Sequence, residues 1–210
     1  MAQRSIKIVS VGDADSAKTS MLYTYEYGSF PDEYAPTIFE NSSKLVKFDD
    51  DGDIKEIDLN IWDTAGQEQY QEMRPLAYQG VDLFLVCFSV VSRDSFSSVT
   101  ETWIPEIRRY APRVPAILVG TKIDLRDDPR EATYHERPIT FQQGAKCAAT
   151  INAVTYLECS AKLGEGIEEI FNEAIRTILH PKVESKSKQF FQCCLAYRLQ
   201  SSSHDDLPTE

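Results

Sequence analysis

Short continuous apolar runs are the clearest pattern along this chain. Residues 83–88 and 114–120 form two such runs, which are typical of strands buried on both faces of a mostly parallel sheet, and residues 6–11 form a shorter apolar run that Lys7 and Ser10 interrupt. Residues 44–48 and 57–61 flank an aspartate-rich turn that contains glycine. Because the regular ligand spacing of a calcium loop is missing there, we expect a β-hairpin.

Helical periodicity fills the gaps between these strands. Residues 18–28 and 93–111 carry helical patterns, Thr140 with Gln143 forms a capping-box start, and residues 30–41 read as a polar loop. A last apolar stripe consists of Ile167, Ile170, Phe171, Ala174, Ile175 and Ile178. The alternation predicts a three-layer α/β fold of about six mostly parallel strands with one antiparallel edge hairpin. Ligands of such sheets bind at the carboxyl ends of the strands.

The loop after the first strand carries the strongest candidate chemistry. Residues 12–20 read Gly-Asp-Ala-Asp-Ser-Ala-Lys-Thr-Ser, close to the phosphate-binding pattern of glycine, four residues, then Gly-Lys-Ser/Thr. In that pattern backbone N–H groups cradle phosphates, the lysine reaches the outer oxygens and the hydroxyl binds magnesium. Gly12, Lys18 and Thr19 fit, whereas Ala17 stands where the second glycine belongs. Alone, the loop fits an ordinary strand-to-helix turn about as well.

A second motif follows the hairpin. Residues 61–68 read Ile-Trp-Asp-Thr-Ala-Gly-Gln-Glu. Asp63 could hold magnesium through water, Gly66 could offer its N–H to a terminal phosphate, and Gln67 could orient an attacking water. A capped helix start explains any one of these residues, but explains the whole set at this spacing poorly.

Two later motifs indicate guanine. Asp124, in Thr-Lys-Ile-Asp, could accept hydrogen bonds from N1–H and the exocyclic amine of guanine, a donor pair that adenine lacks. Lys122 could lay its methylene stem across the base. In residues 158–162, Glu-Cys-Ser-Ala-Lys, the N–H of Ala161 could reach the guanine carbonyl oxygen. An ATP-using enzyme is therefore the disfavoured alternative.

Over residues 4–180 the chain resembles the Ras superfamily of small GTPases and, within it, the Rho family. The Rho-like marks are Thr121 in place of the usual asparagine, Trp-Ile-Pro-Glu-Ile at 103–107, Leu-Arg-Asp-Asp at 125–128 and Tyr-Ala-Pro-Thr-Ile-Phe-Glu-Asn at 34–41. The resemblance implies the P-loop small-GTPase fold, a site for GTP or GDP with Mg²⁺, and hydrolysis without a covalent intermediate. It also implies effector proteins, exchange factors and GTPase-activating proteins as partners.

The resemblance also assigns roles to individual residues. Gln67 would position the hydrolytic water, while Thr19, Thr37 and, through water, Asp63 would hold magnesium. The nucleotide-binding residues would be Gly12, Asp13, Ala14, Asp15, Ser16, Ala17, Lys18, Thr19, Ser20, Phe30, Thr37, Gly66, Thr121, Lys122, Asp124, Ser160, Ala161 and Lys162. The effector-binding residues would be Tyr34, Pro36, Thr37, Ile38, Phe39 and Glu40. Residues 30–41 and 63–78 would be switches ordered by the γ-phosphate.

Two alanines in the loop depart from the family pattern. Ala14 replaces a glycine and would crowd both Gln67 and an incoming arginine finger, whose contribution to the rate is ~10³–10⁵-fold. If the position of Ala17 demands glycine-like dihedrals, strain of about 1–3 kcal/mol would weaken nucleotide binding by about 5- to 150-fold. Asp15 and Ser16 also differ from the usual loop and could give it a compensating shape.

Composition narrows the function classes. A chain of 210 residues, 42% hydrophobic and 26% charged, suits one domain over residues 1–180 and a flexible tail over 181–210. A net charge of -11 argues against a nucleic-acid surface, and no apolar run approaches a membrane span. Five cysteines without zinc or disulfide-framework spacing favour a reducing compartment. We expect a cytoplasmic monomer.

The tail leaves membrane attachment open. It ends Leu-Pro-Thr-Glu and so lacks the prenylated cysteine usual in Rho proteins. Cys193 and Cys194 lie beside two phenylalanines and near three lysines, and palmitoylation of both would suffice for peripheral anchoring. An unmodified tail is an equal alternative.

The leading hypothesis is a Rho-like, Mg²⁺-dependent GTP-binding switch with slow hydrolysis. It would control effector binding in signalling, with the actin cytoskeleton implied by resemblance only. The alternative is a non-catalytic interaction protein, locked in the GTP state by Ala14 or nucleotide-poor because of Ala17.

Overall fold

A six-stranded sheet forms the middle layer of the domain. The computed structural model describes residues 4–32, 39–128 and 137–181. The strands are β1 (Arg4–Val11), β2 (Phe39–Asp50), β3 (Asp53–Thr64), β4 (Leu83–Ser89), β5 (Ala116–Thr121) and β6 (Tyr156–Glu158). They lie in the order β2-β3-β1-β4-β5-β6, with β2 antiparallel to β3 and the other pairs parallel. The predicted fold class is confirmed.

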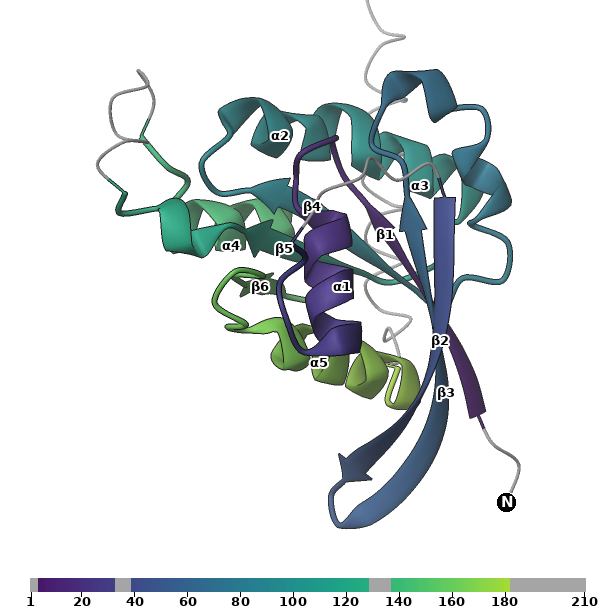
Figure 1. Cartoon of the computed structure of the whole chain (residues 1–210). Coiled ribbons are helices and arrows are strands. Elements are labelled where there is room, and N and C mark those ends of the chain that lie inside the picture. The colour runs from purple at the N-terminus through teal and green to yellow at the C-terminus, as the bar shows by residue number, and fades with distance from the viewer. Residues whose placement is uncertain (1–3, 33–38, 129–136, 182–210) are drawn as a thin grey trace, which may run out of the picture. The chain divides into compact units, whose positions relative to one another are not determined.

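Helices cover both faces of this sheet (Figure 1). The α-helices are α1 (Lys18–Tyr27), α2 (Arg93–Ser98), α3 (Ile104–Tyr110), α4 (Phe141–Thr150) and α5 (Ile167–Leu179). Strand β1 shows the two-sided burial directly, because Ile8 belongs to the core beneath α1 and α5, whereas Val9 belongs to the core beneath α3 and α4. This alternation is the two-residue period of a strand covered on both sides. Among the described helices, none is long and apolar enough to cross a membrane.

Local sequence signals explain where several helices begin and end. Thr140 accepts a hydrogen bond from the N–H of Gln143, and the Gln143 side chain accepts one from the N–H of Thr140, so the predicted capping box is confirmed. Helix α1 ends at Gly28, whose φ of 73° is left-handed.

The helical pattern at 93–111 is interrupted by a π-helix. This segment, Val99–Trp103, joins α2 to α3, and the N–H of Ile104 bonds to the carbonyl of Val99. Pro105 follows at once and has no N–H to continue the regular ladder. The single helix predicted there is thus two α-helices with a wider turn between them.

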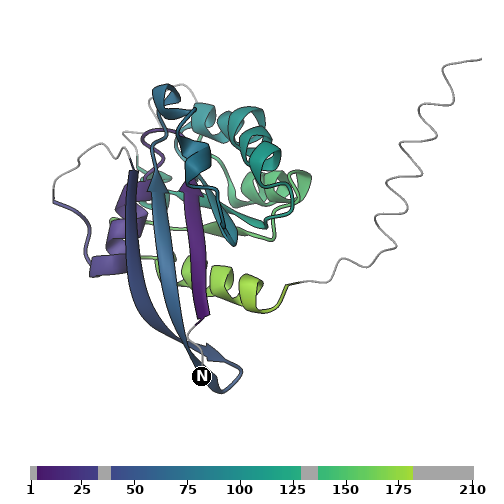
Figure 2. The ribbon, with the colours of Figure 1, turned by 90° about the vertical axis from the view of Figure 1, so that its right-hand side faces the viewer.

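The β-hairpin is longer than the apolar runs indicated. Strand β2 already begins at Phe39, where a loop was predicted, and β3 continues to Thr64. Residues 39–41 pair with residues 62–64, so backbone hydrogen bonding across the hairpin overrides their polar pattern. The hairpin extends beyond the rest of the sheet (Figure 2). Its extension at the other end brings Asp63 level with Ser10 of β1.

The strand ends determine where the site lies. Strands β1, β3, β4, β5 and β6 run in the same direction, so their carboxyl ends meet at one edge of the sheet. Each of the four motifs found in the sequence lies at or directly after one of these ends. The parallel sheet therefore assembles a single site from segments far apart in the chain.

Candidate functional site

The loop between β1 and α1 has an unusual backbone. Gly12 has a φ of 149°, and a Cβ there would lie 2.2 Å from the carbonyl oxygen of Cys87, so only glycine fits. Asp15 and Ala17 are left-handed, with φ values of 62° and 57°. Aspartate tolerates this region better than alanine. Ala17 therefore adopts the conformation for which glycine is normally used.

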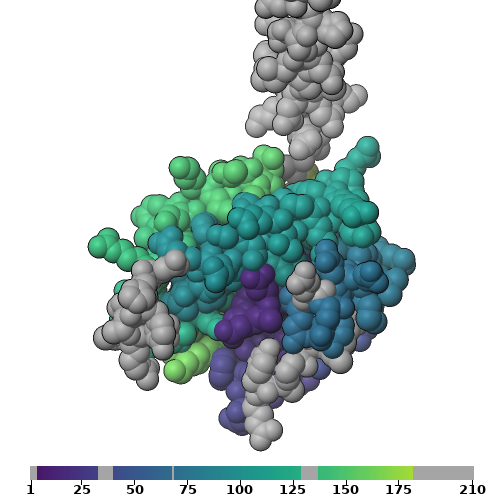
Figure 3. Space-filling model, turned by 90° about the horizontal axis from the view of Figure 1, so that it is seen from above, coloured from purple at the N-terminus to yellow at the C-terminus, as the bar shows by residue number. Residues whose placement is uncertain are grey.

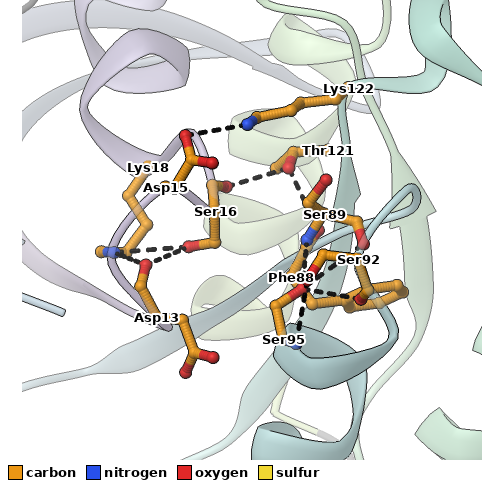
Figure 4. Close-up of polar contacts among 10 residues, drawn as sticks. All are labelled: Asp13, Asp15, Ser16, Lys18, Phe88, Ser89, Ser92, Ser95, Thr121 and Lys122. Atoms are coloured by element: carbon orange, nitrogen blue, oxygen red, sulfur yellow. Dashed lines mark hydrogen bonds and ion pairs between the residues drawn. The ribbon is translucent and has the colours of Figure 1, made fainter. Parts of the chain in front are cut away.

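Lys18 places its ammonium group inside this loop (Figure 4). Its Nζ donates to the carbonyl oxygens of Gly12 and Asp13, at 2.8 and 2.7 Å, and to the hydroxyl of Ser16 at 3.3 Å. The residue is only 5% exposed, and this burial lowers the pKa of Lys18 although the nearby charge of Asp63 opposes the effect. A buried cation encircled by backbone suits an anion such as a phosphate.

Two candidate oxygen ligands lie next to each other, Thr19 at the start of α1 and Asp63 near the end of β3. The hydroxyl of Thr19 donates to Oδ2 of Asp63 at 2.5 Å, and Ser10 donates to Oδ1 of the same carboxylate at 3.0 Å. Asp63 is buried. Hydroxyl and carboxylate oxygens are the hard ligands that Mg²⁺ prefers, so Thr19 and Asp63 fit the role predicted for them.

The segment that carries Gly66 and Gln67 lies directly on the loop. A Cβ on Gly66 would come within 2.3 Å of the nitrogen of Ala14, so this approach requires glycine. Gln67 is half-buried, and its side-chain oxygen accepts a hydrogen bond from Gln69 at 3.4 Å. In the space-filling view from above, the purple atoms of the loop emerge between the blue segment after β3 and the teal helices (Figure 3). The predicted catalytic residue thus lies beside the predicted phosphate site.

The base motifs are attached to the same loop. Thr121 donates to the carbonyl oxygens of Ser16 and Phe88 at 2.9 and 3.0 Å, and Lys122 pairs with Asp15 at 3.0 Å (Figure 4). The substituted position 15 therefore contacts the lysine expected over the base.

Ser160 connects the last two motifs. Its hydroxyl donates to Oδ1 of Asp124 at 2.6 Å and accepts the N–H of Leu163. Ala161, the next residue, is buried, and its carbonyl accepts a bond from Thr24 at 3.3 Å. Asp124 and Ser160, both predicted to contact guanine, are thus hydrogen-bonded to each other, and the adjacent Ala161 is bonded to Thr24 of α1.

Some predicted site residues are peripheral or lie outside the described residues. Phe30 and Lys162 are exposed, whereas Ser20 is buried in α1. Tyr34, Pro36, Thr37 and Ile38 lie outside the described residues, so the switch threonine and most of the effector segment are not placed. The expected tail with Cys193 and Cys194 also lies outside them.

Next to the loop lies a group of buried polar residues that the sequence pattern did not predict. The carboxylate of Asp13 points away from Lys18 (Figure 4) and accepts a 2.6 Å hydrogen bond from the indole nitrogen of Trp103. Arg74 and Glu106 form a buried ion pair nearby. The motif at 103–107 had served only as a mark of resemblance, and no local signal pairs its glutamate with an arginine 32 positions earlier.

A family comparison covers nearly the whole described domain. The model of the Ras family matches residues 7–180, a range that includes all four motifs and every strand end at the site. Proteins of this family bind guanine nucleotides with magnesium, hydrolyse GTP and work with exchange factors, GTPase-activating proteins and effectors. The match spans all of the assembled motifs, and the chain therefore belongs to the Ras family of small GTPases.

Proposed function

We propose that this protein is a Rho-like guanine-nucleotide switch that binds Mg²⁺-GTP through residues 12–19 and hydrolyses it slowly. The carrying observation is that the loop has the shape of a phosphate cradle although Ala17 replaces glycine. Lys18 lies within the loop, and Thr19 contacts Asp63 at its rim.

Contacts within the protein support the loop's shape. Ser16 donates its hydroxyl to Asp13 at 2.8 Å, Thr121 holds the carbonyl of Ser16, and Met21 bonds to the carbonyl of Ala17 at 3.0 Å. Because these bonds fix the left-handed conformation, its strain lowers the stability of the fold more than it lowers the affinity for nucleotide. We therefore favour a loaded protein over a nucleotide-poor one.

The chemistry assigned to the site is alignment and charge stabilisation. Mg²⁺ would be held by Thr19 and, through water, Asp63, and would neutralise charge on the phosphates. Lys18 would add a second positive charge at the outer oxygens, and Gln67 would orient the water. Asp124 would select guanine by accepting hydrogen bonds from the two donors of the base, N1–H and the exocyclic amine.

Slow hydrolysis follows from the position of Ala14. Ala14 is exposed in the loop, and a Cβ on Gly66 would come within 2.3 Å of its backbone nitrogen. A side chain at this corner competes for the space that Gln67 and an arginine finger need. The same crowding favours one second candidate, a GTP-locked interaction protein that binds effectors but does not turn over.

The magnesium site can be tested by nucleotide release. Thr19→Ala and Asp63→Ala should each reduce the effect of Mg²⁺ on the release rate of a labelled GDP by about 10- to 100-fold, the usual effect of perturbing a metal site. Ser43→Ala is a matched control, because it removes a hydroxyl that donates to Asp58 at 2.6 Å on the hairpin. Mg²⁺-independent release in the unaltered protein, or competition by ATP, would overturn the proposal.

The finer family traits are proposals as well. We propose that effectors dock on residues 34–41 and 67–78, that the Rho-like role reaches the actin cytoskeleton, and that the protein is cytoplasmic. Acylation of Cys193 and Cys194 would add peripheral membrane attachment. Replacing both cysteines by serine should abolish palmitate labelling and membrane recovery; unchanged recovery would contradict acyl anchoring.

A further inference from the structure

Four buried residues beside the loop form one polar unit, here called the Arg74 clamp: Arg74, Tyr78, Trp103 and Glu106. Arg74 and Glu106 are 3% and 8% exposed. The guanidinium binds the carboxylate through two bonds, Nη2 to Oε2 at 2.7 Å and Nε to Oε1 at 3.0 Å. Tyr78 adds its hydroxyl to Oε1 at 2.5 Å. This two-pronged geometry fixes the plane of the guanidinium.

The remaining edge of the guanidinium holds the catalytic segment. Nη1 of Arg74 donates to the carbonyl oxygen of Ala65 at 3.3 Å and to that of Gln67 at 3.0 Å. These carbonyls flank Gly66, the residue that lies against the loop. One side chain therefore restrains the backbone on both sides of Gly66 and at the residue expected to orient water.

The clamp also reaches the loop itself. The guanidinium lies over the ring of Trp103, with 4.7 Å between its central carbon and the ring centroid. The same indole donates to Asp13, 90 positions away in the sequence. A continuous set of contacts thus runs from Asp13 through Trp103 to Arg74 and on to the backbone of residues 65–67.

Stability alone is a weak explanation for this arrangement. A buried ion pair loses much of its Coulomb energy to desolvation, so apolar residues of similar volume often stabilise a fold as well. Burial lowers the pKa of Arg74, but the hydrogen bonds and charge of Glu106 outweigh burial and raise it, so the arginine stays charged. Three residues of the clamp, Arg74, Trp103 and Glu106, also line an open cavity of about 570 Å³ together with Asp13 and Gly66, so the clamp lies at the junction between α3 and the loop.

We propose that Arg74 and Glu106 are positioning residues for GTP hydrolysis, which hold residues 65–67 against the loop so that Gln67 can orient the attacking water. Trp103 couples this segment to Asp13. The inference rests on the proposed function, because it concerns the same reaction, but the position of residues 65–67 can be measured without any turnover.

The chain offers a matched control for the clamp. Arg126 binds Glu158 through two bonds of 2.9 and 2.5 Å, and Tyr156 adds its hydroxyl to the same carboxylate at 2.6 Å. This second Arg-Glu-Tyr cluster joins the segment after β5 to β6 and, among the described residues, makes no bond to residues 65–67. Arg126→Lys therefore repeats the chemical change of Arg74→Lys at a different place.

The test combines amide hydrogen exchange with single-turnover hydrolysis of preloaded GTP. Arg74→Lys keeps the charge but loses the fork, and should raise exchange at residues 65–67 by about 10-fold or more and lower the hydrolysis rate by about 10-fold. In Arg74→Lys, the exchange rates in α5 and the affinity for GDP should stay within about threefold of those of the unaltered protein. Glu106→Gln keeps the size of the side chain and one acceptor oxygen but loses the charge and the second acceptor, so its exchange and hydrolysis rates should fall between those of Arg74→Lys and the unaltered protein.

The other possible results separate the clamp from the proposed hydrolysis. A general rise in exchange with an unchanged hydrolysis rate would show a merely structural ion pair and overturn the inference, as would equal effects from Arg126→Lys. If the unaltered protein does not hydrolyse GTP at all, the slow-turnover proposal fails. Exchange then decides alone: a rise confined to residues 65–67 in Arg74→Lys supports the clamp, and unchanged exchange overturns it.

Discussion

Ala17→Gly tests the energetic interpretation of the loop most sharply. Ala17 has φ 57° and ψ 24°, a left-handed conformation that costs an L-residue about 1–2 kcal/mol. Glycine removes this strain but adds about 0.4–1 kcal/mol of chain entropy to the unfolded state. We expect a net gain of about 1 kcal/mol in the free energy of unfolding, which corresponds to a melting temperature about 2–4 °C higher for a domain of this size.

The assay is thermal and denaturant unfolding at fixed nucleotide and Mg²⁺ concentrations, because bound ligand itself raises stability. Ala149→Gly is the matched control: Ala149 is exposed in the right-handed helix α4, where the same change should cost about 0.5–1 kcal/mol. We expect the free energy of unfolding to rise in Ala17→Gly and to fall in Ala149→Gly. The GDP affinity of Ala17→Gly should stay within about fivefold of that of the unaltered protein. Equal destabilisation in both variants, or a 100-fold gain in affinity, would refute the reasoning.

Three further changes test other parts of the site. Asp124→Asn should weaken GTP binding in competition assays by about 10- to 150-fold, as expected for lost charged hydrogen bonds, and xanthosine triphosphate should bind it better than GTP; an unchanged preference would contradict the guanine assignment. Ala14→Gly should raise single-turnover hydrolysis by about 10-fold or more, and an unchanged rate would remove the crowding argument. Burial raises the pKa of Cys87 from 9.0 to about 12, so the native state binds an extra proton in that window and stability falls as pH rises through it. Cys87→Ala should flatten this fall by up to about 1.4 kcal/mol per pH unit in chemical unfolding, whereas parallel curves would contradict the assigned burial effect.

The fold was largely predictable because strand burial leaves a direct mark on the sequence. The run at 83–88 is apolar without interruption and residues 6–11 are mostly apolar, because β4 and most of β1 are covered on both faces. Once the parallel order was expected, the meeting of Thr19 with Asp63 followed from where strands end. The extent of β2 did not follow, because its first residues are held by pairing across the hairpin and not by apolar burial.

The Arg74 clamp could not be predicted for a related reason. A lone arginine or glutamate in a helical pattern usually faces solvent, and only the tertiary packing of α3 buries Glu106 against Arg74. Asp13 shows the same limit: its place in the loop suggested a contact with nucleotide but gave no sign that its side chain accepts a hydrogen bond from Trp103. Local spacing indicates chemistry within one segment but not contacts between distant ones.

The central claim is that this loop, with Ala14 and Ala17 in it, holds a guanine nucleotide. Freshly purified protein in magnesium buffer can be denatured and the released nucleotide identified and quantified by ion-exchange chromatography. The account predicts a stoichiometric amount of guanine nucleotide, with GTP persisting beside GDP because hydrolysis is slow. Protein that releases no nucleotide and takes up no added GTP would contradict the account.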